Sequence, residues 1–199
     1  MDDSLQSLLG ELERFGAEND ARTAQRSDKM LNITPETGEL LAILALGMKA
    51  RHVLEIGTSN GYSTLWLADA MKAVSGLVVT LEISAAKAEM ARQNFERADL
   101  SQWIRQELME AGEFLREQPP STFDMLFLDS NREQYLAWWP WIERVLAPGG
   151  LLVVDNAVSH AAEMESFIAQ VRATAGWRSV VVPIGNGELI ALKPNTSAS

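Results

Sequence analysis

Short apolar runs alternate with longer helical stretches over most of the chain. The runs show no clean alternation of apolar and polar residues, which is typical of strands buried on both faces of a sheet. We expect strands at His52–Ile56, Leu77–Leu81, Trp103–Leu108, Phe123–Leu128 and Leu151–Val154. Helices are expected between them, at Tyr62–Met71, Ala85–Ala98, Glu110–Glu117 and Glu133–Leu146. This order predicts a parallel sheet that helices cover on both sides.

Two further helices are expected before the first strand. Apolar side chains recur every three or four residues from Leu5 to Phe15, which places them on one face of an amphipathic helix. A second helix is expected from Pro35 to about Met48, because Thr34 is a suitable N-cap. Proline is also favoured at the first helical position.

The end of the chain follows a different pattern. Two apolar runs, at 179–182 and 189–192, flank Gly185-Asn186-Gly187 and predict an antiparallel hairpin at one edge of the sheet. The whole pattern predicts a doubly wound α/β fold with a mostly parallel sheet of seven strands. A length of 199 residues fits one domain. We expect residues 1–34 to form an N-terminal helical cap and residues 194–199 to be a disordered tail.

Composition narrows the classes of function. The chain has 17 Lys and Arg against 27 Asp and Glu, a net charge of −10, and this disfavours binding to nucleic acid. It has no cysteine, so disulfides, thiolate nucleophiles and Cys-ligated zinc are excluded. The longest apolar run, Leu40–Met48, is too short to span a bilayer, and Met1-Asp2-Asp3 is acidic where a signal peptide is basic. The sequence therefore predicts a soluble protein of the cytoplasm with no membrane contact.

Polar residues follow the first two strands, where a doubly wound sheet binds its ligands. Gly57 and Gly61 flank the turn after the first strand and allow close approach of a ligand, and the next helix offers unpaired N–H groups to an anion. Glu82, at the end of the second strand, is able to accept hydrogen bonds from both hydroxyls of a ribose. The alternatives are a plain strand–helix connection and a solvated glutamate at a strand end.

A second polar group follows the fourth and fifth strands. Asp129 ends one strand, and Asp155-Asn156 end the next. Two carboxylates and an amide form an oxygen-only set, which suits Mg²⁺ or Ca²⁺ rather than zinc. The alternative is ordinary loop chemistry, with Asp129 as a helix cap and Asp155-Asn156 in an Asx-turn.

The segment from Val53 to Thr64 resembles the first motif of the cation-dependent O-methyltransferases, a family that includes catechol and caffeoyl-CoA O-methyltransferases. The resemblance extends from about Met30 to Lys193. It includes Thr34-Pro35-Glu36, Glu82, Phe127-Leu128-Asp129, Tyr135, Pro148-Gly149-Gly150 and Asp155-Asn156. It implies a Rossmann-like methyltransferase that uses S-adenosylmethionine.

The resemblance also implies roles for single residues. Asp129, Asp155 and Asn156 match the family's ligands for a divalent cation, Mg²⁺ or Ca²⁺. Glu55, Gly57, Thr58 and Ser63 would surround the methionine part of the cofactor, and Glu82 would hold the ribose. The full set expected at the cofactor is Ile33, Glu55, Gly57, Thr58, Ser59, Gly61, Ser63, Glu82, Ile83, Glu110, Ala111 and Asp129.

The expected acceptor is a small molecule with vicinal hydroxyls, such as a catechol. A cation chelated by two such oxygens would lower the acceptor pKa and hold the attacking oxygen. Many family members have a lysine base three residues after the first aspartate, whereas this chain has Arg132, which cannot release its proton. Arg132 would either stabilise the phenolate or be a surface residue at a helix start, and His160 would reach the acceptor or only begin a helix.

Other functions stay open on the sequence alone. Arg132 and a short loop after Asp155-Asn156 suggest a cofactor-binding member with weak or lost turnover. Arg22, Arg26 and Lys29 suggest an RNA-modifying methyltransferase of the same family, against which the net charge argues. The N-terminal helix is expected to form a homodimer contact, on the basis of the resemblance.

Overall fold

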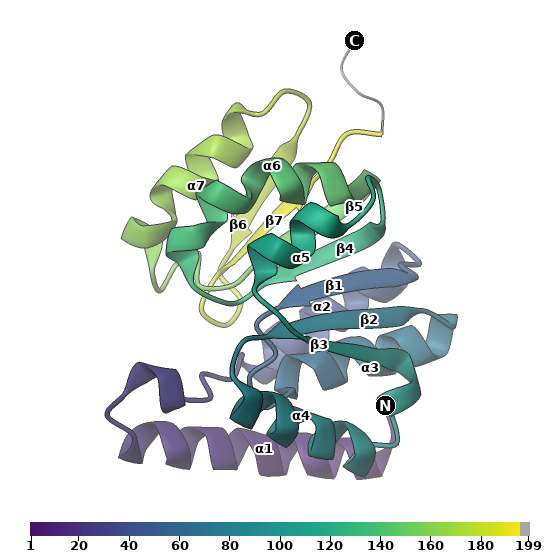
Figure 1. Ribbon diagram of the computed structural model, residues 1–199, viewed down its shortest axis with the longest axis vertical. Coiled ribbons are helices and arrows are strands. Elements are labelled where there is room, and N and C mark those ends of the chain that lie inside the picture. Colours follow the sequence, from purple (N-terminus) through teal and green to yellow (C-terminus); the bar gives the residue numbers. More distant parts are fainter. Residues whose placement is uncertain (196–199) are drawn as a thin grey trace.

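The computed structural model describes residues 1–195, and its centre is a seven-stranded sheet in the order β3-β2-β1-β4-β5-β7-β6 (Figure 1). The strands β1 to β5 pair in parallel, and β7 pairs antiparallel with both β5 and β6. The predicted doubly wound fold with a terminal hairpin is therefore confirmed. The strands are β1 (His52–Ile56), β2 (Leu77–Glu82), β3 (Ile104–Leu108), β4 (Phe123–Leu128), β5 (Leu146–Val154), β6 (Arg178–Val182) and β7 (Glu188–Leu192).

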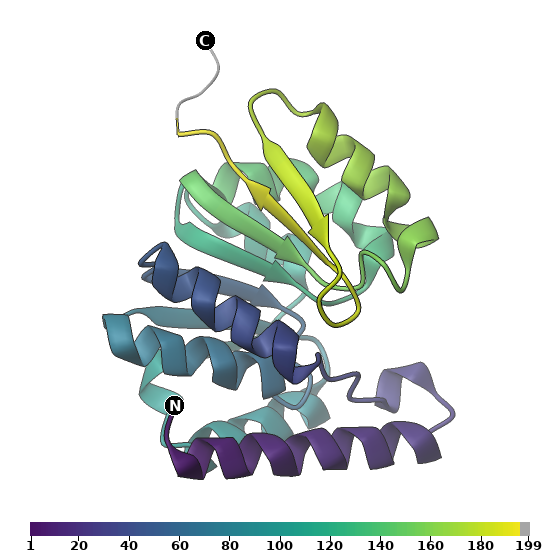
Figure 2. The same cartoon turned by 180° about the vertical axis from the view of Figure 1, so that it is seen from behind.

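Helices cover both faces of the sheet (Figures 1 and 2). One face packs against α2 (Pro35–Gly47), α3 (Tyr62–Val74) and α4 (Ala85–Arg97), and the other against α5 (Ala111–Glu117), α6 (Tyr135–Val145) and α7 (Ala161–Ala173). In β1, Val53 belongs to the first apolar core and Leu54 to the second, and both are buried. Burial on both faces explains why the strands lack an apolar–polar alternation.

The N-terminal helix α1 (Asp3–Arg22) packs outside α3 and α4 (Figure 2). Leu5, Leu8, Leu9 and Leu12 are buried as the spacing predicts, but Phe15 is 41% exposed. The buried face continues instead through Gly16, which lies against Asn32. After α1 the chain turns through a short helix, η1 (Arg26–Asp28). Asp20 accepts the N–H groups of Met30 and Leu31 at 2.7 and 2.8 Å, which folds this segment back toward the sheet.

Several details differ from the predicted elements. β5 begins at Leu146, because residues before the apolar run also pair with β4. Helix α7 is additional to the expected helices, and Met164, Phe167 and Val171 bury one side of it. In the expected tail, Pro194 and Asn195 lie beside Gly176 and Gly149, and residues 196–199 lie outside the described residues. Across residues 1–195, no helix is long and apolar enough to cross a membrane.

Candidate functional site

The turn after β1 lies against the end of β4, and two glycines shape it. Gly57 has φ +111°, and a Cβ built there would lie 2.0 Å from the carbonyl oxygen of Asp129. Gly61 has φ +86° at the N-cap of α3, and a Cβ there would lie 2.5 Å from the ring of Phe95. Both positions therefore require glycine, and the close approach that each permits in this structure is to the protein itself.

A buried network underlies this turn. The carboxylate of Glu55 accepts hydrogen bonds from Ser63 Oγ and Thr80 Oγ1, both at 2.6 Å, and from Thr64 Oγ1. Thr58 Oγ1 lies 2.6 Å from Thr80 Oγ1. Burial raises the pKa of Glu55 above its usual value. Ser63 thus binds Glu55, and Thr80 binds both Glu55 and Thr58. These buried hydrogen bonds hold the turn in place.

Glu82 lies at the end of β2 and receives three backbone N–H groups. Its Oε2 accepts from Ser59 at 2.8 Å, and its Oε1 accepts from Ile83 and Ser84 at 2.9 and 2.8 Å. A carboxylate has about four acceptor positions, so Glu82 keeps capacity for a further donor on Oε2. The next residue, Ile83, is 76% exposed and offers an apolar surface beside the carboxylate.

Two chain segments border the turn after β1 and Glu82. Ser59 Oγ donates to the carbonyl of Met30 at 2.8 Å, which holds the segment containing the buried Ile33 against the turn. On the other side, the N–H of Met109 donates to the carbonyl of Glu82 at 3.0 Å and brings in Glu110 and Ala111. The side chain of Glu110 accepts the N–H of Glu113 at 2.8 Å and so caps α5, and Ala111 is buried.

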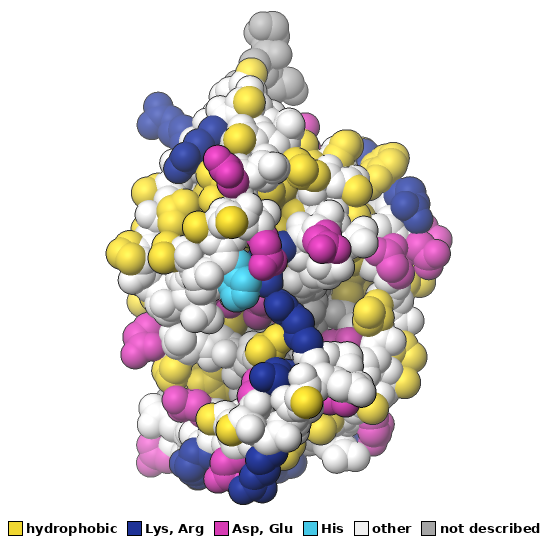
Figure 3. Space-filling view, turned by 90° about the vertical axis from the view of Figure 1, so that its left-hand side faces the viewer, with side chains coloured by type: hydrophobic (Ala, Val, Ile, Leu, Met, Phe, Trp, Pro, Cys, Tyr) yellow, Lys and Arg dark blue, Asp and Glu magenta, His cyan; other side chains and the backbone are white. Residues whose placement is uncertain are grey.

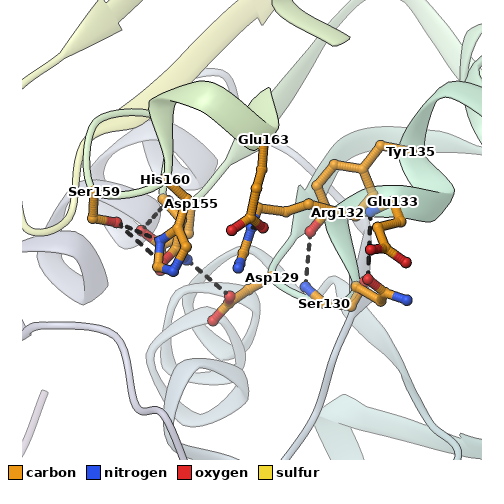
Figure 4. Close-up of polar contacts among 11 residues, drawn as sticks. Asp129, Ser130, Arg132, Glu133, Tyr135, Asp155, Ser159, His160 and Glu163 are labelled. Carbon is orange, nitrogen blue, oxygen red and sulfur yellow. Dashed lines mark hydrogen bonds and ion pairs between the residues drawn. The ribbon is translucent and has the colours of Figure 1, made fainter. Parts of the chain in front are cut away.

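The predicted oxygen set assembles at the ends of β4 and β5 (Figure 4). Asn156 Nδ2 lies 2.7 Å from Asp155 Oδ2 and 3.3 Å from Asp129 Oδ1, so one amide joins both carboxylates. Asn156 has φ 70°, and its N–H donates to Asp155 Oδ1 at 2.6 Å. The expected convergence of these three side chains is therefore present in the fold.

Acidic side chains are concentrated at the ends of β4 and β5. Burial raises the pKa of Asp129 well above its usual value, and the charges of Asp155 and Glu55 raise it further. Burial also raises the pKa of Asp155. A third carboxyl group, which was not predicted from the sequence, is that of Glu188 at the start of β7. Burial and the charge of Asp155 raise the pKa of Glu188 to about 9.

Glu188 is fully buried and only half satisfied. Its Oε1 accepts a hydrogen bond from Thr37 Oγ1 at 3.0 Å, whereas its Oε2 has no partner within residues 1–195. A charged residue that begins an apolar strand is the one signal in the sequence that would have singled out Glu188. Glu188 therefore leaves one buried carboxyl oxygen of this site without a hydrogen-bond partner among residues 1–195.

Arg132 lies at the start of a short helix, η3 (Arg132–Gln134), and its side chain is only 5% exposed. Its Nε binds Glu163 Oε2 of α7 at 2.7 Å, and this contact lowers the pKa of Glu163. The surface alternative for Arg132 is therefore wrong. Its charge also acts on Asp129, whose pKa it lowers against the effect of burial.

His160 is the N-cap residue of α7, four residues after Asn156, and its backbone N–H donates to the carbonyl of Asn156 at 3.0 Å. Its Nδ1 lies 2.9 Å from Ser159 Oγ. Figure 3 shows one face of the molecule with a hollow across its middle, around which Lys or Arg, Asp or Glu and a histidine gather. Over the described range, no group of three or more His, Cys, Asp and Glu side chains is arranged as a metal site.

A family model described as O-methyltransferase matches residues 6–183 of the chain. A catechol O-methyltransferase of Niastella koreensis is 34% identical over 131 residues, which are 64% of this chain and 59% of that protein. The chain spans less than three fifths of the length of the curated catechol O-methyltransferases that it matches.

Solved structures give longer matches. An O-methyltransferase from Bacillus cereus in complex with SAH has a TM-score of 0.78 and 27% identity, with coverage of 94% of this chain and 90% of the other. The O-methyltransferase TomG from Streptomyces achromogenes, involved in tomaymycin synthesis and solved with SAM, has a TM-score of 0.77 and 25% identity. The match covers 98% of this chain and 91% of TomG.

Proposed function

Because this chain belongs to the O-methyltransferase family, we propose that it moves a methyl group from S-adenosylmethionine to a hydroxyl of a small, catechol-like acceptor, with the help of a divalent cation. The observation that carries this proposal is the position of Asp129, Asp155 and Asn156. They converge at the ends of two neighbouring strands, and the backbone of Asp129 lies against Gly57 of the turn after β1. Cofactor and acceptor would therefore meet at one point.

The cofactor would lie on the turn side of the site. Glu82 has acceptor capacity left for a ribose hydroxyl, and the exposed side chain of Ile83 would pack against the adenine. A second ribose hydroxyl would compete with the N–H of Ser59 for Glu82. Ser63 binds Glu55 and Thr58 binds Thr80, and these hydrogen bonds support the turn, so they would position the backbone that the cofactor touches.

The residues present fit a divalent cation. Asp129 and Asp155 are buried acids with raised pKa values, and Glu188 Oε2 has no partner in the described part of the chain. A bound cation would supply the positive charge that these groups lack, and an all-oxygen donor set is the one that Mg²⁺ and Ca²⁺ prefer. Asp129, Asp155 and Asn156 would hold the cation, which would lower the pKa of a chelated acceptor hydroxyl.

Arg132 would act through its positive charge rather than by accepting a proton. It is buried, it is fixed by Glu163, and a guanidinium does not release its proton in a protein. Its positive charge near Asp129 would favour an anionic acceptor oxygen. This assignment makes the ionised acceptor the nucleophile and leaves the removal of its proton to solvent or another group.

The alternatives have no comparable support. Of the cationic residues that suggest RNA binding, Arg22 lies 3.8 Å from Glu18 in α1. The net charge of −10 argues against an RNA substrate. A lost-turnover member would need a disrupted site, whereas Asn156 lies within hydrogen-bonding distance of both Asp129 and Asp155.

The test is a methyl-transfer assay with labelled S-adenosylmethionine and a panel of catechols, with EDTA and with added Mg²⁺. We expect activity that EDTA removes and Mg²⁺ restores, and that Asp155→Ala loses in both conditions. Glu165→Ala, at an exposed position of α7, is the control and is expected to behave as the wild type. A full rate in EDTA would overturn the role of the cation, and failure with every catechol would overturn the acceptor class.

A further inference from the structure

A short chain of hydrogen bonds connects His160 to the oxygen set. Ser159 Oγ lies 3.2 Å from Asn156 Oδ1 and 2.9 Å from His160 Nδ1. The backbone holds the same three residues together, because the N–H of His160 donates to the carbonyl of Asn156 at 3.0 Å. One hydroxyl therefore bridges the amide of a predicted cation ligand and an imidazole ring at the mouth of the site.

The donors in this chain are determined by elimination. Asn156 Nδ2 faces the carboxylates of Asp129 and Asp155, so Oδ1 faces Ser159 and only accepts. The single hydroxyl proton of Ser159 is then used on Asn156. Nδ1 of a neutral His160 must therefore carry a proton and donate it to Ser159 Oγ, which leaves Nε2 with a free lone pair.

A cation between Asp129 and Asp155 would require the opposite amide orientation. Asparagine binds Mg²⁺ and Ca²⁺ through its carbonyl oxygen, whereas its NH₂ group is only a donor. If Oδ1 turns toward the cation, Nδ2 turns toward Ser159 and donates to its Oγ. The hydroxyl proton of Ser159 then has His160 Nδ1 as its acceptor, and the ring proton moves to Nε2.

We propose that Asn156, Ser159 and His160 form a relay in which cation occupancy selects the His160 tautomer, so that Nε2 is a hydrogen-bond donor only when the cation is bound. The inference rests on the proposed function, because it takes the cation site from it. An Nε2–H group suits an acceptor oxygen that is becoming an anion, since hydrogen bonds to charged oxygens are the stronger ones. His160 is thus a positioning group for the acceptor, and the loaded site alone presents the matching polarity.

The tautomer is measurable without turnover. The chain has two histidines, His52 and His160, so an imidazole ¹H–¹⁵N spectrum contains two ring systems, and His52→Gln assigns them. We would record spectra of the full chain at about pH 9, where histidine is neutral, in EDTA and then with saturating Mg²⁺. We expect a protonated Nδ1 in EDTA and a protonated Nε2 with Mg²⁺.

Two variants separate the relay from a general effect of the cation. In Asn156→Asp the carboxylate keeps an oxygen ligand and adds a negative charge but has no NH₂ group, so Ser159 always donates to it and His160 keeps a protonated Nδ1 with Mg²⁺. In Ser159→Ala the connection is absent, so Mg²⁺ is expected to leave the tautomer ratio unchanged. Ser4→Ala, at an exposed position of α1, is the matched control and is expected to respond as the wild type.

Titration calorimetry with Mg²⁺ on the same samples distinguishes the two ways of failing. If the wild type binds Mg²⁺ and His160 keeps one tautomer, the relay is wrong while the cation site stands. If Asn156→Asp binds Mg²⁺ and still switches to Nε2–H, the amide is not the selector and the relay is wrong. If the wild type shows no binding of Mg²⁺, the cation part of the proposed function and the relay both fail.

Discussion

Glu188→Gln is expected to remove a pH dependence from the stability of the protein. Burial and the neighbouring Asp155 raise the pKa of Glu188 from 4.5 to about 9 in the folded state. Between these values the folded chain holds a proton on Glu188 that the unfolded chain has released. The folded state thus binds more protons, so the free energy of unfolding falls as the pH rises through this window. Glutamine has no proton to lose there and keeps a polar group beside Thr37.

The expected magnitude follows from a difference of one proton. Such a difference changes the free energy of unfolding by about 1.4 kcal/mol per pH unit. Between about pH 6 and about pH 8, the wild type should therefore lose roughly 3 kcal/mol more than Glu188→Gln. A change of this size is a large part of the stability of an ordinary domain, so it is readily measured.

The assay is urea unfolding at several pH values, in EDTA so that no cation compensates the acids. Glu165→Gln, an exposed glutamate on α7, is the control and should follow the wild type at every pH. Curves of stability against pH that run parallel for the wild type and Glu188→Gln would refute the reasoning. They would mean that Glu188 has the same proton occupancy in the folded and unfolded chains.

Three further predictions concern the turn, the cofactor and Arg132. Glu82→Ala should raise the dissociation constant for S-adenosylmethionine roughly tenfold to a hundredfold, because a hydrogen bond to a charged acceptor contributes about 1.5–3 kcal/mol; unchanged affinity in calorimetry would remove Glu82 from the site. Gly57→Ala should cost on the order of 3 kcal/mol of stability in urea unfolding, because φ is +111° and the new Cβ would meet the Asp129 carbonyl. Gly47→Ala, where a Cβ has open space, should cost little in the same assay. Arg132→Gln should shift the pH–rate curve on one catechol to higher pH, since the positive charge near the acceptor is lost, while Arg132→Lys should keep the rate through its charge or raise it by supplying a base. Superimposable curves for all three proteins would show that Arg132 takes no part.

The sequence by itself determined the order and nature of most of the elements. Most strands of the parallel part are short apolar runs, and the glycine turn or polar residue that ends each of them follows directly in the chain, so these signals are local. The convergence of Asp129 with Asp155 and Asn156 was also predictable, because parallel strands end at the same edge of a sheet. Helix α7 was additional to this pattern.

Only the tertiary structure decided what the polar side chains bind. Thr37 and Glu188 are 151 positions apart, and Arg132 and Glu163 are 31 apart, so no local pattern links them. Burial, which raises the pKa of Asp129 and of Glu188, likewise depends on which helices cover the sheet edge. The strand ends specify where the chemistry is, whereas the charge and hydrogen-bond polarity of the site depend on contacts that exist only once distant segments have packed together.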